Sequence, residues 1–157
     1  MTASPRRRAE RQHIGWREWV SLPDFGVLRI KAKVDTGART STLHAFGLEL
    51  FDRNDDEWAR FSIHPRQRST EAAVTVEAPV SGWKRVRSSN GQSEHRPVLL
   101  TPVGLLGREW PIELTLSNRD QMGFRMLLGR QAVRRRFLVD PGRSYVANRR
   151  LPGKVPT

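Results

Sequence analysis

The sequence predicts a small all-β domain with one short helix near its C-terminal end. The chain has 157 residues, about the size of one ordinary domain. Short runs of alternating apolar and polar residues recur along it, and turn-forming residues separate these runs. Segments with helical periodicity are scarce. Many short strands at such spacing are typical of an all-β barrel or sandwich.

The clearest strand starts at Gly26 and leads directly into Asp35. Its residues alternate with period two, which predicts one buried and one exposed face. The apolar face has Leu28, Ile30, Ala32 and Val34, and the basic face has Arg29, Lys31 and Lys33. Further strands are expected in Trp58–Ile63, Ala73–Ala78, Trp83–Ser88, Pro97–Thr101, Trp110–Leu116 and Phe124–Leu128.

A hairpin and a helix complete the expected elements. Asn90-Gly91 predicts a two-residue hairpin turn, because both positions can take positive φ. This hairpin is either an ordinary surface hairpin or a mobile flap over a cleft. The short helix is expected from about Arg130 to Arg136, directly after Gly129.

The two ends of the chain are polar and basic. We expect residues 1–13 and 147–157 to be disordered tails around a single folded domain, residues 14–146. No apolar stretch approaches the length of a membrane span, and the basic N-terminus lacks the apolar segment of a signal peptide. These features predict a cytoplasmic protein.

The composition limits the chemistry that the chain can perform. Cysteine is absent, which excludes disulfides, thiolate catalysis and cysteine-ligated metal sites. The four histidines, His13, His44, His64 and His95, are scattered along the chain, so we expect no bound metal and no cofactor.

The net charge of +12 raises nucleic acid, ribosomes or acidic peptides as partners. The ordinary alternative is an arginine-rich, solvated surface, and no recognised nucleic-acid motif accompanies the charge. If the arginines do bind RNA, removing Arg134, Arg135 and Arg136 should weaken that binding.

Asp35-Thr36-Gly37 is the first candidate site. An apolar strand ends there in an acid, a hydroxyl residue and a glycine. The glycine permits a tight turn, whose N–H groups can hold the carboxylate. A carboxylate at the end of a buried strand is costly unless it is hydrogen-bonded or functional. The alternative is an ordinary turn between two elements, stabilised by the aspartate side chain.

A second motif follows far downstream, where Leu127-Leu128-Gly129-Arg130 leads into the expected helix. In this order the two motifs resemble those of retropepsins, and they resemble a bacterial branch more closely. That branch includes the RimB-type proteins, often labelled putative ATP-dependent zinc proteases. The segments that carry this resemblance are Ile30–Ser41, Arg87–Gly91, Arg108–Glu113 and Met122–Arg130.

The resemblance implies a small closed acid-protease barrel and an aspartic endopeptidase activity. Asp35 from each subunit of a homodimer would form a dyad that shares one proton, so that one carboxylate acts as base on a water molecule. Thr36 would lock the two loops together, and Gly37 would bind the substrate backbone. Leu127, Leu128, Gly129 and Arg130 would support the site.

The resemblance also suggests where substrate would lie. The expected substrate contacts are Ala38, Arg39, Ser89, Asn90 and Gly91. Viral retropepsins usually continue Asp-Thr-Gly-Ala with further acids, whereas Arg39 follows here. This arginine suggests modified or acidic peptides as substrates; alternatively, it makes a salt bridge.

Two other functions stay open at this point. The first is a non-catalytic protein that uses the same fold to associate with RNA or ribosomes. The second, weaker possibility is a metallopeptidase. The residues give no support to the label of ATP-dependent zinc protease, since neither a G-x-x-x-x-G-K-[ST] motif nor an H-E-x-x-H motif occurs.

Overall fold

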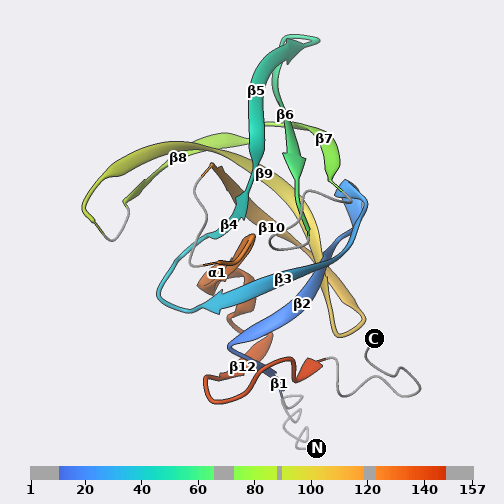
Figure 1. The fold of residues 1–157 in the computed structure, drawn as a ribbon, viewed down its shortest axis with the longest axis vertical. Helices are drawn as coiled ribbons and strands as arrows, with labels where there is room; N and C mark the ends of the chain where they lie inside the picture. Colours follow the sequence, from blue (N-terminus) through green and yellow to red (C-terminus); the bar gives the residue numbers. More distant parts are fainter. Residues whose placement is uncertain (1–10, 66–72, 88–89, 119–122, 148–157) are drawn as a thin grey trace, which may run out of the picture.

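The computed structural model describes residues 11–65, 73–87, 90–118 and 123–147, and Figure 1 shows their arrangement. These residues form strands almost throughout, with one short helix and one 3-10 turn, so the predicted all-β class is confirmed. The helical elements are η1 (Pro23–Phe25) and α1 (Arg130–Val133). The strands are β1 (Gln12–Gly15), β2 (Arg17–Leu22), β3 (Val27–Asp35), β4 (Ser41–His44), β5 (Phe46–Arg53), β6 (Asp56–Ile63), β7 (Val74–Pro79), β8 (Gly82–Arg87), β9 (Ser93–Leu105), β10 (Arg108–Ser117), β11 (Met126–Gly129) and β12 (Phe137–Asp140).

The largest sheet curves around the core. Its strand order is β10-β4-β11-β3-β2-β9-β8, and β9 also pairs with β10, so six of its strands form a ring of pairings. The join between β2 and β9 places Ser21 opposite Gly104. A Cβ on Gly104 would lie 2.1 Å from Ser21 Oγ, so glycine permits this close approach. Fully buried side chains fill the interior, among them Ile30, Leu99 and Leu114.

In strand β3 the alternation of the sequence predicts most of the buried residues, and strand pairing explains the exception. Ile30, Ala32 and Val34 are buried, as the alternation predicts. The prediction for Leu28 is wrong: its side chain is 92% exposed, and Val27 is buried instead. The register against β2 shifts between the pairs Val20–Ile30 and Leu22–Val27. Such a bulge inserts one residue and reverses which residues face the core.

The expected helix is shorter than predicted. It ends at Val133, because Arg134 has φ −57° and ψ 141°. Arg135 then takes a positive φ of 66°, and the chain turns into β12. The alternation also gave no indication of β1, β2, β4, β5 and β12. Strands β1, β4 and β12 have only four residues each, and all four residues of β4 are buried, so they show little alternation. Strand β2 does alternate in burial, but the polar Glu18 occupies one of its buried positions, so the pattern is hidden in the sequence.

Residues at both ends of the described part of the chain take part in the fold. Gln12 and His13 belong to β1, which pairs in parallel with β12. Ala147 is buried, and its N–H group donates to the Glu18 carboxylate at 3.1 Å. The predicted boundaries at residues 13/14 and 146/147 stay predictions, because residues 1–10 and 148–157 lie outside the described part of the chain.

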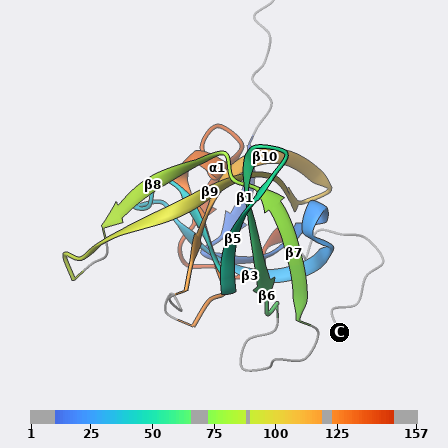
Figure 2. The same ribbon diagram turned by 90° about the horizontal axis from the view of Figure 1, so that it is seen from above.

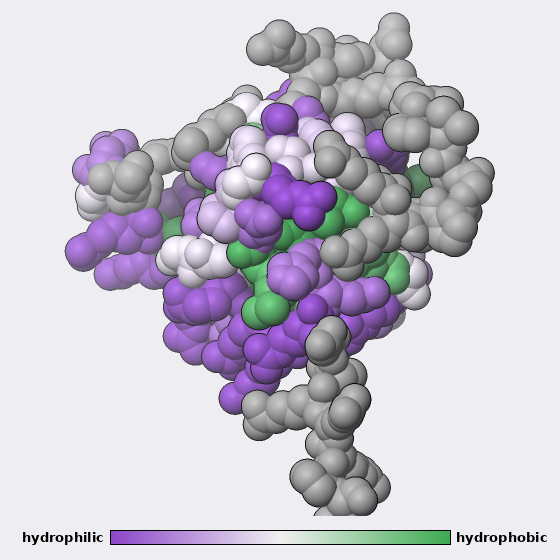
Figure 3. All heavy atoms as spheres, turned by 90° about the horizontal axis from the view of Figure 1, so that it is seen from below, coloured by the Kyte–Doolittle hydropathy of each residue, from purple (hydrophilic) through white to green (hydrophobic). Residues whose placement is uncertain are grey.

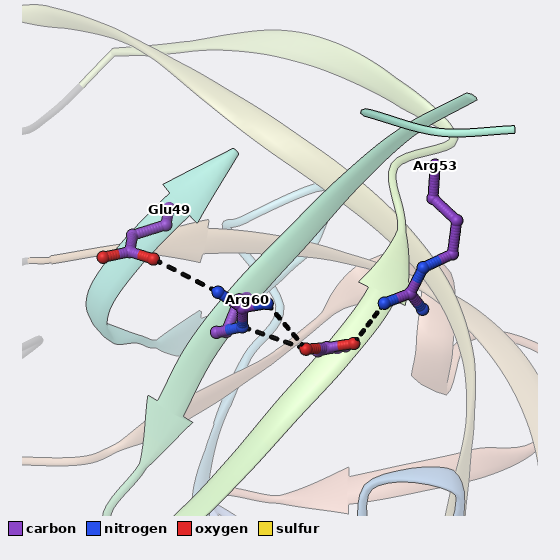
Figure 4. A network of polar contacts seen from close by, with 4 residues as sticks. Glu49, Arg53 and Arg60 are labelled. Atoms are coloured by element: carbon purple, nitrogen blue, oxygen red, sulfur yellow. Dashed lines mark hydrogen bonds and ion pairs between the residues drawn. The ribbon is translucent and has the colours of Figure 1, made fainter. Parts of the chain in front are cut away.

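The second sheet, β5-β6-β7, is antiparallel and lies at the upper end of the molecule in Figure 1. Its surface carries a network of charged side chains (Figure 4). Arg53 and Arg60 both donate to the Glu77 carboxylate, at 2.6 Å and 2.9 Å, and Arg60 also lies 3.5 Å from Glu49. Hydrogen bonds from Arg53 and Arg60 hold the pKa of the Glu77 carboxyl below its ordinary value.

The opposite end of the molecule contains β1, β12 and part of β2. Seen from below, this end is largely hydrophilic around one hydrophobic area (Figure 3). None of the helices in the described part of the chain has the length and apolar character that a membrane crossing requires.

Candidate functional site

Asp35 stands at the end of β3, where the strand leaves the sheet. Its Oδ1 atom accepts hydrogen bonds from the N–H groups of Gly37 and Ala38, at 3.0 Å and 3.2 Å. Among the described residues, no other group bonds this carboxylate. The side chain is half-buried, and Thr36 and Gly37 are exposed. The loop thus holds one carboxylate oxygen in place and leaves the other, Oδ2, available to a ligand.

Strand β11, which contains the Leu127-Leu128-Gly129 motif, pairs with the end of β3 that leads into this loop. It runs parallel to β3, with Leu127 opposite Lys33, Leu128 opposite Val34 and Gly129 opposite Asp35. Leu128 is fully buried, whereas Leu127 is half-buried.

Gly129 sits where a side chain would not fit. A Cβ there would lie 2.6 Å from the carbonyl carbon of Thr40 and 2.9 Å from the Ser41 nitrogen. The Gly129 N–H group donates to Ser41 Oγ at 3.0 Å. The next two N–H groups, of Arg130 and Gln131, donate to the carbonyl oxygens of Ala38 and Arg39 at 2.7 Å and 3.1 Å. The loop and the start of α1 therefore form one hydrogen-bonded unit.

Three positively charged side chains lie in or next to the loop. Arg39 and Arg130 are exposed, and the Arg130 guanidinium donates to the Thr36 carbonyl oxygen at 3.1 Å. From β8, Lys84 pairs with Glu113 and lies 3.5 Å from Thr40 Oγ1. Sequence reasoning missed Lys84, because a single lysine in a strand gives no signal of the loop that it reaches.

The β8–β9 hairpin contains the other predicted substrate contacts. Its strands pair from Gly82 and Val98 to Arg87 and Ser93. Because residues 88 and 89 lie outside the described part of the chain, the two-residue turn at Asn90-Gly91 stays a prediction. Asn90 Oδ1 accepts a hydrogen bond from the Gln92 N–H group at 3.2 Å. Gly91 has a φ of 84°, while Ser89 lies outside the described residues.

The hairpin extends from the body of the molecule on the side where the loop after β3 lies, as Figures 1 and 2 both show. Lys84 joins the base of the hairpin to that loop. Its role as a flap, and the contacts of Asn90 and Gly91 with a substrate, stay predictions.

His44 does not line this loop. It is buried, with Nε2 lying 3.0 Å from the Asn118 carbonyl oxygen and Nδ1 lying 3.2 Å from the Arg125 guanidinium. Its ring stacks on Phe46 at 4.2 Å, and Phe46 stacks on His64 at 3.9 Å. Within the described residues, no three His, Asp or Glu side chains lie close enough together to hold a metal ion.

Comparison with known proteins places this geometry in context. The RimB-like family, described as retropepsin-like aspartic endopeptidase RimB, matches residues 13–150. A crystal structure of a Legionella pneumophila protein of unknown function has a TM-score of 0.71 and 26% identity, covering 88% of this chain and 99% of that one.

Curated relatives carry a different functional name. Proteins from Desulfotalea psychrophila and Shewanella pealeana, each named probable alpha-L-glutamate ligase, are 47% and 46% identical over 128 and 132 residues. These matches cover 82% and 84% of this chain. The chain spans only 28% and 29% of the length of these relatives.

These names overturn the predicted activity. The sequence predicted an aspartic endopeptidase, a hydrolase, whereas the relatives are named as ligases. The word endopeptidase in the family description does not remove this conflict. The geometry explains why the sequence misled: an Asp-Thr-Gly loop supported by Leu-Leu-Gly describes a backbone arrangement, which does not determine the reaction. The predicted homodimer and RNA association stay predictions.

Proposed function

We propose that this chain, which belongs to the RimB-like family, binds a peptide that carries glutamate residues and serves as a substrate for α-L-glutamate ligation. The proposal rests on the curated relatives, which are named probable alpha-L-glutamate ligases. The relatives are about three times longer than the matching segment, so most of each relative lies outside it. In this proposal the chain supplies recognition of the peptide at the Asp35 loop, in the cytoplasm.

The observation that carries the proposal is a loop that contains one half-buried carboxylate, Asp35, and one exposed arginine, Arg39, while the exposed Arg130 donates to the Thr36 carbonyl oxygen of the same loop. Asp35 keeps Oδ2 without a hydrogen bond from the described residues, and Arg39 and Arg130 are exposed beside it. The first residue of a polyglutamate peptide with a free amino terminus carries one ammonium group and one side-chain carboxylate, and the next residue adds a second side-chain carboxylate. Asp35 has the charge to bind the ammonium group, and the two arginines have the charge and geometry to bind carboxylates.

The local framework favours such binding because little has to be ordered when the ligand arrives. The N–H groups of Gly37 and Ala38 fix the Asp35 side chain, and the N–H groups of Arg130 and Gln131 fix the backbone of the loop. A site held in place before binding loses less conformational entropy on association.

Isothermal titration calorimetry with tetraglutamate and tetraglutamine peptides tests the proposal. Tetraglutamate should bind and tetraglutamine should not, because only the first has side-chain carboxylates for the arginines. Arg39→Ala should weaken binding roughly tenfold or more, the effect expected for one charge-assisted hydrogen bond. Arg108→Ala, which removes an exposed arginine from the start of β10, is the matched control and should leave the affinity unchanged.

The position of the amino group provides the sharper test. Asp35→Asn should weaken binding of tetraglutamate with a free amino terminus and should not affect the N-acetylated peptide. Equal binding of both peptides by the wild type would contradict the role of Asp35. Equal affinity for tetraglutamate and tetraglutamine would contradict the proposed function as a whole.

A further inference from the structure

A second basic surface lies on strands β2 and β3, outside the Asp35 loop. In this antiparallel pair, Arg17 lies opposite Lys33 and Trp19 lies opposite Lys31. Residues that alternate with them, such as Glu18 and Ala32, are fully buried. The outward positions therefore form one continuous face. We call Arg17, Trp19, Arg29, Lys31 and Tyr145 together the β2–β3 face.

Cations and aromatic rings alternate across this face. The Arg17 guanidinium lies 4.6 Å from the Trp16 ring and 4.9 Å from the Tyr145 ring. The Trp19 ring stacks on Tyr145 at 5.9 Å, with 21° between the planes. Arg29 lies 4.3 Å from the Trp19 ring, and the Lys31 ammonium lies 5.5 Å from it. Each ring thus orders at least one positive group at the surface.

Hydrogen bonds hold the Tyr145 segment against the strands. The Arg17 side chain donates from Nε to Ser144 Oγ at 3.1 Å. The Tyr145 N–H group donates to the Arg17 carbonyl oxygen at 2.9 Å. These contacts restrict Arg17 and Tyr145 before any partner binds, so that a partner meets side chains that already have little rotational freedom.

The β5-β6-β7 sheet provides an internal contrast. There too, arginines lie over rings, with Arg53 at 4.5 Å from Trp58 and Arg60 at 4.9 Å from Phe51. Those arginines also pair with Glu77, as Figure 4 shows, and their charge is therefore balanced within the sheet. Cation–ring contacts alone do not create a binding surface.

Strands β2 and β3 differ from that sheet in the residues that they place on their outer face. Their outward positions carry no acidic residue before Asp35 at the end of β3. The acid of β2, Glu18, is fully buried, and the N–H groups of Gly15, Val146 and Ala147 donate to its carboxylate. The two strands therefore contribute positive charge to this face, in a chain of net charge +12.

We propose that the β2–β3 face binds single-stranded nucleic acid. A guanidinium that lies over a ring keeps its in-plane N–H groups for phosphate oxygens. Trp19 and Tyr145 are half-buried, so unpaired bases can stack on the part of their rings that stays exposed and on the plane of the exposed Arg29 guanidinium. Single strands offer both groups to one face, whereas an acidic peptide offers the charge and nothing that matches the rings. The face differs from the Arg134–Arg136 cluster that the sequence alone suggested.

Fluorescence anisotropy with a labelled 12-nucleotide oligouridylate, measured at several salt concentrations, tests this proposal. The double variant Arg29→Ala/Lys31→Ala should bind at least roughly tenfold more weakly than wild type. Its salt slope, log K against log salt concentration, should be shallower by about 0.7 for each phosphate that the variant no longer neutralises. The matched control, Arg53→Ala/Arg60→Ala, removes two ring-contacting arginines from the other sheet and should bind as wild type does.

Further experiments distinguish binding at this face from binding at the proposed peptide site and from unspecific binding of anions. Asp35→Asn and Arg39→Ala should leave oligouridylate binding unchanged, so that failure of one proposal does not decide the other. Trp19→Leu, with its fold verified by circular dichroism, should weaken binding of oligouridylate. The proposal is overturned if the Arg29/Lys31 variant binds like wild type, or if polyglutamate of equal charge displaces the RNA as effectively as unlabelled RNA does.

Discussion

Two carboxylates on neighbouring strands, Glu18 of β2 and Asp35 of β3, have opposite surroundings. Glu18 is fully buried and accepts N–H groups from Gly15, Val146 and Ala147, at 2.6 Å, 2.9 Å and 3.1 Å. These bonds use both of its oxygens. Asp35 is half-buried and accepts bonds at Oδ1 from within its own loop. The first carboxylate holds distant parts of the chain together, and the second remains available to a ligand.

The comparison teaches that the use of a carboxylate depends on which donors surround it. Glu18 joins the start of the fold to its last described residues, because Val146 and Ala147 lie far from it in sequence. Asp35 orders only its own turn. A substitution at Glu18 should therefore act on stability, and a substitution at Asp35 should act on binding.

The largest effect is expected for Glu18→Ala. The change leaves three buried N–H groups without their acceptor, and a single such group costs roughly 1–3 kcal/mol. The free energy of unfolding, measured with urea, should fall by about 3 kcal/mol or more. Glu18→Gln keeps one acceptor oxygen and should cost less than Glu18→Ala. A decrease of less than about 1 kcal/mol in the free energy of unfolding for Glu18→Ala would show that the Glu18 carboxylate does not hold the two ends of the described chain together.

Gly129→Ala should have the next largest effect, because it strains the support of the Asp35 loop. The new Cβ would meet the Thr40 carbonyl carbon at 2.6 Å, and the hydrogen bonds from Arg130 and Gln131 to the neighbouring carbonyl oxygens of Ala38 and Arg39 oppose a shift of the loop. Such overpacking costs about 1–3 kcal/mol. Gly82→Ala is the matched control, since a Cβ there meets nothing within 4 Å. If thermal unfolding shows that Gly129→Ala and Gly82→Ala destabilise the protein equally, the close contact with Thr40 is not the cause of the effect at Gly129.

Asp35→Asn should change stability by no more than about 0.5 kcal/mol, because the amide oxygen still accepts both N–H groups. The same variant should lose binding of the free-amino tetraglutamate. Urea unfolding and calorimetry on one preparation measure the two effects together. A large decrease in stability would place Asp35 in the same structural class as Glu18.

The smallest effect concerns Glu77, a third carboxylate at the surface, whose pKa is lowered by hydrogen bonds from Arg53 and Arg60. A carboxyl group with a lowered pKa in the folded state stabilises the fold above its ordinary pKa of 4.5. This contribution disappears as pH falls through the lowered pKa. The difference in unfolding free energy between wild type and Glu77→Gln should therefore be small near neutral pH and should vanish in acid. A difference that grows toward low pH would contradict this sign.

The family resemblance came from the sequence because its motifs are local in the chain. Val34-Asp35-Thr36-Gly37 predicted a strand that ends in a turn, and Leu127-Leu128-Gly129 predicted its apolar support. In the structure Gly129 lies opposite Asp35, and the roles of the two motifs in a site stay predictions. The activity did not follow, because the same loop geometry serves different reactions.

The sequence by itself determined the all-β class and the strand before Asp35, since alternation acts over a few residues. The pairing of the two distant motifs was implied by the family resemblance and not by any local pattern. Only the tertiary structure decided that Glu18 is a buried clamp, that Lys84 reaches the loop at Thr40, and that Tyr145 completes the β2–β3 face. These contacts join residues far apart in the chain. They depend on strand register, and one bulge between β2 and β3 was enough to turn Leu28 outward.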